Sequence, residues 1–173
     1  ADIKLPGHPE SFQMDADSKK IFVNVPDAQM LATIDLDKNL ITDKWKIEIA
    51  KANFPMALDL ANHRLFIGCR NPAKLLVIDN ETGKTIAQID IDSDTDDVFY
   101  DNLSKQIYVS CGGGYVDVVK QNGLDKYEVT SRIESRAGAR TSLFVPELNQ
   151  LLVAAPARSG SEAQLMIYEK MKR

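Results

Sequence analysis

Short apolar runs recur along this 173-residue chain at a nearly constant interval. Four of them read Ile-Phe-Val, Leu-Phe-Ile, Ile-Tyr-Val and Leu-Leu-Val, and they begin at residues 21, 65, 107 and 151. Runs that are short and apolar at consecutive positions are typical of strands covered on both faces. The regular interval predicts four copies of one structural unit.

Each unit repeats one order of strands and turns around its central run. A small or apolar strand precedes the run, and a third strand and a polar turn follow it. Outer strands then alternate polar and apolar residues, as expected of an edge that faces water on one side. The outer strands are expected at residues 44–49, 85–91 and 127–133. The pattern predicts an all-β protein in which no helix is convincingly encoded.

A repeat of about 40 to 45 residues that forms four antiparallel strands is typical of a β-propeller blade. A β-sandwich also has many short strands, but it does not predict four units with the same internal order. We therefore treat residues 1–173 as one β-propeller domain, or a portion of one. The four blades are expected at residues 7–49, 52–91, 94–134 and 138–169.

The two ends of the chain raise the question of how the ring is completed. Residues 1–5 lie where the outer strand of a neighbouring or last blade is expected, and the last unit stops near Tyr168 with a short charged tail. Three arrangements are open: a closed four-bladed ring, part of a larger ring, or a ring shared with another chain. Four blades around one axis need strong curvature, which favours the second and third arrangements.

Charge and composition argue against several classes of protein. The formal net charge is −4 and the basic residues are scattered, so nothing predicts a nucleic-acid or membrane-surface footprint. No apolar run approaches the roughly 20 residues that span a bilayer. Cys69 and Cys111 end equivalent strands in adjacent units, and we expect free, buried thiols because neighbouring blades splay apart. No catalytic triad order, zinc spacing or paired-carboxylate motif stands out.

The candidate binding face is the one that gathers the loops between blades around the axis, because equivalent positions of every blade meet there. Arg70 and Arg140 are the best anion contacts, although each could instead pair with aspartates of the 94–97 loop. His8 lies in a rigid loop where an imidazole could bind a ligand, or serve no task at all. The candidate ligand-binding residues are His8, Glu10, Asn53, Arg70, Asp96, Asp97 and Arg140.

A divalent cation such as Ca²⁺ is a second possibility on this face. When the units are aligned by their second strands, Glu10 and Asp96 occupy the same position in the repeat, and Asn53 lies one residue before it. Carboxylate and amide oxygens are the ligands that Ca²⁺ takes. The alternative is that the acidic residues cap turns or accept backbone hydrogen bonds.

The repeats resemble a known family. The stretches IFVNVPDAQMLATIDLDKN, LFIGCRNPAKLLVIDNETGK and IYVSCGGGYVDVVKQNG are similar to the YVTN-type β-propeller repeat of surface-layer-like and related exported proteins. The resemblance covers three units well and the fourth in part. It implies a ring of about seven blades and a periplasmic or extracellular location, with a cytoplasmic one left open. It does not imply one ligand, because repeat families of this kind carry many.

Two functional hypotheses follow from different classes. The first is a non-catalytic scaffold that binds a small molecule or protein on its loop face, because the loops are polar and varied and no catalytic set is assembled. The alternative is a metal-dependent, lactonase-like hydrolase with an ion in the channel. Binding of single-stranded nucleic acid is a third hypothesis, and the net negative charge argues against it.

Overall fold

The computed structural model describes residues 1–158 and 160–169, and its strands form four antiparallel sheets that follow one another along the chain. The first sheet contains β1 (Phe12–Asp15), β2 (Lys20–Val25), β3 (Met30–Asp35) and β4 (Leu40–Lys46). The second contains β5 (Lys51–Asp59), β6 (Arg64–Asn71), β7 (Ala73–Asp79) and β8 (Thr85–Asp90). The third contains β9 (Thr95–Asp101), β10 (Gln106–Cys111), β11 (Tyr115–Gly123) and β12 (Lys126–Glu134). The fourth contains β13 (Thr141–Val145), β14 (Gln150–Ala155) and β15 (Gln164–Glu169).

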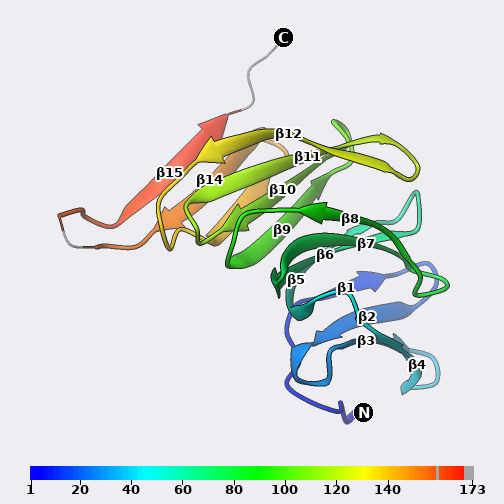
Figure 1. The fold of residues 1–173 in the computed structure, drawn as a ribbon. Coiled ribbons are helices and arrows are strands. Elements are labelled where there is room, and N and C mark those ends of the chain that lie inside the picture. Colours follow the sequence, from blue (N-terminus) through cyan, green and yellow to red (C-terminus); the bar gives the residue numbers. More distant parts are fainter. Residues whose placement is uncertain (159, 170–173) are drawn as a thin grey trace.

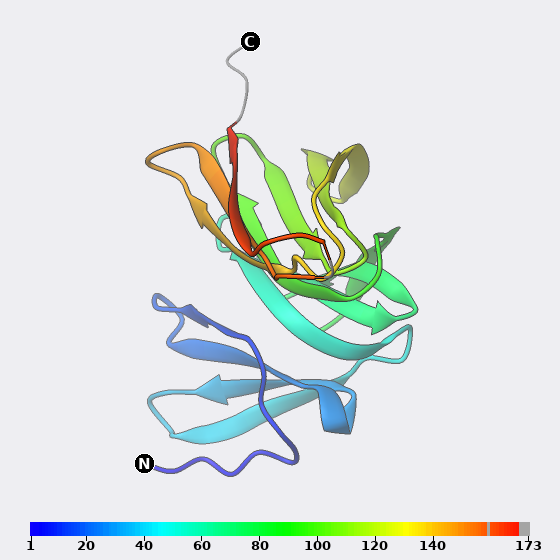
Figure 2. The ribbon, with the colours of Figure 1, turned by 90° about the vertical axis from the view of Figure 1, so that its left-hand side faces the viewer.

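These sheets are the blades of a β-propeller, numbered here 1 to 4, and the predicted fold class is confirmed. Strands pair in sequence order within each sheet. The first strands of the blades lie next to each other, because β5 contacts β1 and β9, and β9 contacts β13. The blades follow each other in chain order (Figure 1), with the first and last at opposite ends of the stack (Figure 2).

The core lies between the blades. Second strands carry side chains on both faces, so Phe22 and Leu65 meet between blades 1 and 2, and Phe66 and Ile107 between blades 2 and 3. Full burial of a large apolar side chain stabilises a fold by about 1.5–3 kcal/mol. The continuous apolar runs are therefore the contacts that hold neighbouring blades together.

The turn from the first to the second strand explains the aspartates that end three of the units. Asp15 accepts hydrogen bonds from the backbone N–H of Asp17 and Ser18, and Asp101 does the same for Leu103 and Ser104. The last turn residue then has positive φ, as Lys19, His63 and Lys105 show. In blade 4 backbone bonds close the equivalent turn instead, from Leu148 and Asn149 to Val145 and Pro146.

Two details differ from the sequence prediction. The outer strand of blade 1 begins at Leu40 instead of residue 44, because Asp35 accepts the Lys38 N–H at 2.9 Å and Asn39 takes positive φ, so the turn closes early. Residues 1–5 form no strand; Ile3 and Leu5 pack against the face of blade 1 that points away from blade 2. Within the described part of the chain, no helix is long and apolar enough to cross a bilayer.

Candidate functional site

Two arginines and two aspartates from three blades meet on the loop face. Arg70 is the second-last residue of β6 in blade 2. Asp94 and Asp96 flank the first residue of β9 in blade 3, and Arg140 precedes β13 of blade 4. Each aspartate lies between both guanidinium groups. Arg70 Nε is 3.3 Å from an oxygen of Asp94, and a terminal nitrogen of the same guanidinium group pairs with Asp96. Arg140 pairs with Asp94, and its Nε lies 3.6 Å from Asp96. We call these four residues the arginine–aspartate cluster.

Backbone and ring contacts position the cluster. Arg70 Nε also donates to the Thr95 carbonyl at 2.8 Å, and its guanidinium lies 4.2 Å from the centre of the Phe54 ring. Asp94 has a φ of 60°, and its carbonyl accepts the Gly112 N–H at 2.9 Å. A Cβ on Gly112 would come within 2.2 Å of an Asp94 oxygen. A side chain at residue 112 would therefore displace the Asp94 carboxylate from its place in the cluster.

The side chains of the cluster are held in place by their contacts and are still partly exposed to solvent. The side chains of Arg70 and Arg140 are 24% and 40% exposed. Partly exposed ion pairs each contribute little to stability, about 0–1 kcal/mol. The bond to Asp94 raises the pKa of Arg140 although partial burial opposes that shift. The cluster is therefore better explained as a preorganised set of charges at the rim of the axis than as a main source of stability.

A cavity of about 380 Å³ opens between the first strands of all four blades. Its polar lining includes Ser11, Gln13, Asp96 and Asp97, and its apolar lining includes Phe144. The Asp97 carboxylate accepts the Ser142 N–H at 2.6 Å and so joins blade 3 to blade 4. Burial raises the pKa of Asp97; the bond from Ser142 opposes this rise, and the charge of Asp96 adds to it.

His8 and Glu10 form a separate pair in the loop that enters blade 1. His8 Nε2 lies 3.6 Å from a Glu10 oxygen, and the histidine side chain is 72% exposed. The His8 N–H donates to Asp27 at 3.2 Å, and the Glu10 N–H donates to the Asn24 carbonyl at 2.9 Å. These contacts place both residues on blade 1, apart from the contacts that build the arginine–aspartate cluster.

Asn53 is buried and links blade 2 to blade 1. Its side-chain nitrogen donates to Asn24 Oδ1 at 3.0 Å and to the Met30 carbonyl at 3.1 Å. Asn24 in turn donates to the Phe54 carbonyl at 3.0 Å. The sequence interpretation missed Asn24, although a polar residue inside the apolar run IFVNV is a signal for a buried polar contact. Asp94, the centre of the cluster, was also missing from the predicted site residues.

The three predicted cation ligands, Glu10, Asn53 and Asp96, have different surroundings. Asp96 is shared by two guanidinium groups. The Asn53 nitrogen donates to blade 1, while its side-chain oxygen, the atom that would bind a cation, is buried without a hydrogen-bond partner among the described residues. Among residues 1–158 and 160–169, no group of three or more His, Cys, Asp or Glu side chains is arranged to hold a metal ion. The set Glu10, Asn53 and Asp96 remains a prediction from the sequence alone.

The two cysteines are free and buried, as the sequence predicts. Burial raises the pKa of each thiol to about 12. A thiol with such a pKa is almost fully protonated at neutral pH and is a poor nucleophile.

Solved structures resemble this chain over most of its length. Hydrazine synthase from Kuenenia stuttgartiensis superimposes with a TM-score of 0.81 at 16% identity, over 95% of this chain and 46% of that chain. A mitotic checkpoint complex gives 0.77 at 14% identity, over 96% and 52%. A putative 6-phosphogluconolactonase from Bacteroides uniformis gives 0.67 at 12% identity, over 78% and 43%. No family model and no curated protein matches the chain.

These likenesses establish the β-propeller fold and no more, because all three identities are below 25%. The chain spans about half the length of the structures it matches.

Proposed function

We propose that this chain is a non-catalytic β-propeller scaffold that binds a polar small molecule, or a polar segment of a protein, on its loop face. The observation that carries the proposal is the arginine–aspartate cluster, which draws on three blades and stays accessible to solvent. Charged groups held in a fixed arrangement at a concave surface bind at low entropic cost.

The contacts suggest how such a ligand is recognised. Guanidinium groups match carboxylate and phosphate oxygens in bidentate fashion, so an anionic group competes with Asp94 and Asp96 for Arg70 and Arg140. Donors on the ligand then meet the freed aspartates and the polar lining of the adjoining cavity. The mitotic checkpoint complex among the structural neighbours supports a protein as one kind of partner.

Amide chemical shifts in a titration with citrate and inorganic phosphate test this proposal. We expect shifts concentrated in residues 70–74, 94–97 and 138–142, because the backbone around the cluster responds when its ion pairs exchange. Replacing Arg140 with glutamine should weaken the response about tenfold or more. Lys38→Gln, at an exposed turn of blade 1, is the matched loss of one charge and should leave it unchanged. If both substitutions weakened the response equally, the effect would come from net charge alone, and the proposal would be overturned.

A lactonase-like hydrolase is the second candidate function. The putative lactonase among the neighbours and the raised pKa of Asp97 at the cavity support it. It requires turnover of lactones or esters that Glu10→Ala abolishes, together with a higher melting temperature in excess Ca²⁺. Absence of both would leave the binding scaffold as the function to pursue.

A further inference from the structure

The cavity between the first strands carries one sign of charge on its walls. Among the described residues that line it, the charged ones are Asp96 and Asp97, and none is a lysine, an arginine or a histidine. Asp96 is already paired with the two arginines of the arginine–aspartate cluster. The cavity is therefore negative inside, although two guanidinium groups lie beside it.

Asp97 is a half-buried carboxylate that forms no ion pair within the described part of the chain. It accepts the Ser142 N–H at 2.6 Å. Burial raises its pKa, and the like charge of Asp96 adds to that rise. A cation that enters the cavity would stabilise the charged form of this carboxylate. Asp97 lies in blade 3, with described blades on both sides of it, so the residues that flank it on either side belong to the described structure.

Two aromatic side chains line the cavity close to Asp97. Phe99 follows Asp97 by two residues on β9, and Phe144 follows Ser142 by two residues on the neighbouring strand β13. Side chains two positions apart on a strand point to the same face. Asp97 and Phe99 thus share one face of β9, and both phenylalanines pack against the core between blades 3 and 4. A ligand at Asp97 therefore meets apolar rings next to the charge.

Tyr100, the third aromatic residue of the lining, is committed to the interface between blades 2 and 3. Its ring centre lies 5.0 Å from that of Phe66, and Phe66 also has an edge contact with Tyr127 at 5.9 Å. The Tyr100 hydroxyl donates to Gln121 at 2.6 Å. The rings that remain for a ligand are those of Phe99 and Phe144.

The neutral part of the lining is poor in free hydrogen-bond donors. Pro55 and Pro146 have no backbone N–H. The Gln13 side-chain nitrogen already donates to the Met56 carbonyl at 3.1 Å, and its oxygen stays an acceptor. An ammonium group donates up to three hydrogen bonds and accepts none. The lining is therefore matched to such a group in hydrogen bonding as well as in charge.

We propose that this cavity binds the ammonium group of an organic cation, which pairs with Asp97 and places its apolar part against Phe99 and Phe144. A carboxylate beside aromatic rings is a favourable setting for an organic ammonium ion, because the ring faces also attract positive charge. A bare metal ion suits the cavity less well, because most of the wall is apolar and no three ligating side chains converge within the described chain.

This inference rests on the proposed binding function and names the chemical class of its ligand. Asp96 belongs both to the cavity lining and to the arginine–aspartate cluster. A compound that carries an ammonium group and a carboxylate or phosphate can therefore meet Asp97 with one end and Arg140 with the other.

Phenethylamine, which is protonated at neutral pH, and its neutral isostere 2-phenylethanol are the probes. In an amide-shift titration we expect the amine to shift residues 97–99 and 142–144 and to bind at least tenfold more tightly than the alcohol. Asp97→Asn should weaken amine binding tenfold or more, because the amide still accepts the Ser142 N–H but has no charge. Asp37→Asn, at an exposed turn of blade 1, is the matched loss of one negative charge and should leave binding unchanged.

A second variant approaches the site from the opposite wall. Ser11→Lys brings an ammonium group into the cavity from blade 1 and should block the amine, even if Asp97→Asn does not fold. Equal affinity for amine and alcohol, or equal weakening by the two aspartate substitutions, would overturn the inference.

The anion titration separates this inference from the proposed function. If citrate and phosphate shift residues 70–74 and the amine does not bind, the proposed function stands and this inference is wrong. If the amine binds and the anions do not, the inference stands and the role given to the arginines is wrong.

Discussion

The interfaces on the two sides of blade 3 share one plan and differ in how fully they are closed. Toward blade 2, three rings pack together and Arg64 joins Asp79 and Asp125 across the interface. Toward blade 4, the pair Tyr108 and Phe144 borders an open groove. The difference shows that the outer strand is what closes the space between two blades that splay apart.

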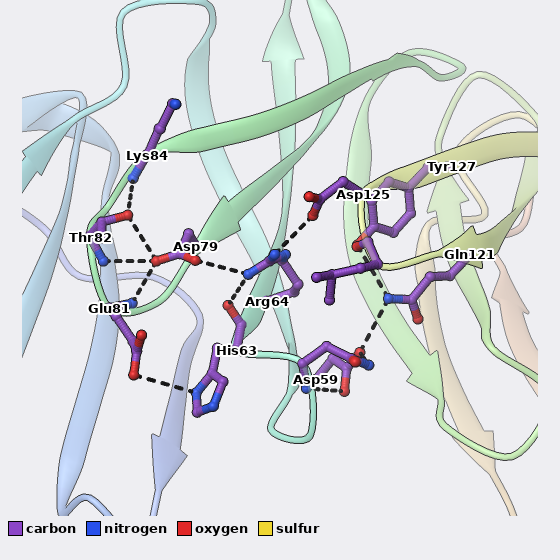
Figure 3. A network of polar contacts seen from close by, with 12 residues as sticks. Asp59, His63, Arg64, Asp79, Glu81, Thr82, Lys84, Gln121, Asp125 and Tyr127 are labelled. Carbon is purple, nitrogen blue, oxygen red and sulfur yellow. Dashed lines mark hydrogen bonds and ion pairs between the residues drawn. The ribbon is translucent and has the colours of Figure 1, made fainter.

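Polar groups follow the same division. At the closed interface, Gln121 accepts a hydrogen bond from Tyr100 and donates to Tyr127 and Asp59. Figure 3 shows the contacts of Gln121 with Tyr127 and Asp59. At the open one, Gln106 stands at the position equivalent to Arg64 and bonds within blade 3, to Ser104 and Tyr108. At this end of the blades, Arg64 and Gln121 therefore link blades 2 and 3, whereas the Gln106 contacts stay within blade 3.

The largest expected contrast comes from truncating the central ring of each interface. Phe66→Ala should lower the free energy of unfolding by about 3–5 kcal/mol, because it leaves a cavity among packed rings. Tyr108→Ala should cost less, about 2 kcal/mol, because the ring lines a groove and its removal leaves a less enclosed cavity. Urea unfolding of both variants measures the difference. Equal losses would show that the two interfaces are packed alike.

The ion pairs give the next largest effect. Arg64 is 7% exposed, and Arg64→Met leaves Asp79 and Asp125 without their shared partner. We expect a loss of about 2 kcal/mol in the free energy of unfolding. Gln106→Met, the equivalent change at the open interface, should cost less than about 0.5 kcal/mol. The comparison fails if the glutamine substitution destabilises the protein as much as the arginine one.

Removal of one hydroxyl group is a finer test. The Tyr127 hydroxyl donates to the Leu124 carbonyl at 3.0 Å and accepts from Gln121 at 3.3 Å. Tyr127→Phe should therefore cost about 1 kcal/mol. The Tyr168 hydroxyl, which donates to the Glu134 carbonyl at 3.0 Å beside the open groove, should matter less, at about 0.5 kcal/mol. Thermal unfolding with both variants checks the order.

The smallest effect is a pH dependence at the blade 3 to blade 4 contact. Burial raises the pKa of Asp97, so its charged form disfavours the folded state, and wild-type stability falls as pH rises through the folded-state pKa. Asp97→Asn can still accept the Ser142 N–H and should raise the melting temperature by about 1–2 °C at pH 7. The gain should vanish below about pH 4, near the unfolded pKa. Scans at both pH values test the sign; a gain that persists in acid contradicts it.

Periodicity predicted the fold because it follows from local sterics and burial. The apolar runs beginning at Ile21, Leu65 and Ile107 became second strands, and the aspartates at 15, 59 and 101 formed the turns before them. The boundary of β4 was wrong, because the side chain of Asp35 and the φ of Asn39 decide where that turn closes. Such contacts within a turn involve only a few atoms and do not change the spacing of apolar residues, so the hydrophobic pattern does not reveal them.

The candidate site could be predicted only in part. Sequence placed Arg70, Arg140 and Asp96 on one face and allowed their pairing, which the structure shows. It could not separate Asn53 from that group, since only the packing of blade 1 against blade 2 sets its side chain beside Asn24. The family resemblance and the predicted cation stay predictions.

What this sequence determined by itself is the repeat: the number of units, their strand order and the face on which their loops gather, all of which depend on residues close together in the chain. What only the tertiary structure decided is which charges pair and which side chains meet between neighbouring blades. Those depend on contacts between residues 15 to 62 positions apart, such as Arg64 with Asp79 and Gln121 with Asp59. The angle between sheets sets such distances, and no local pattern encodes that angle.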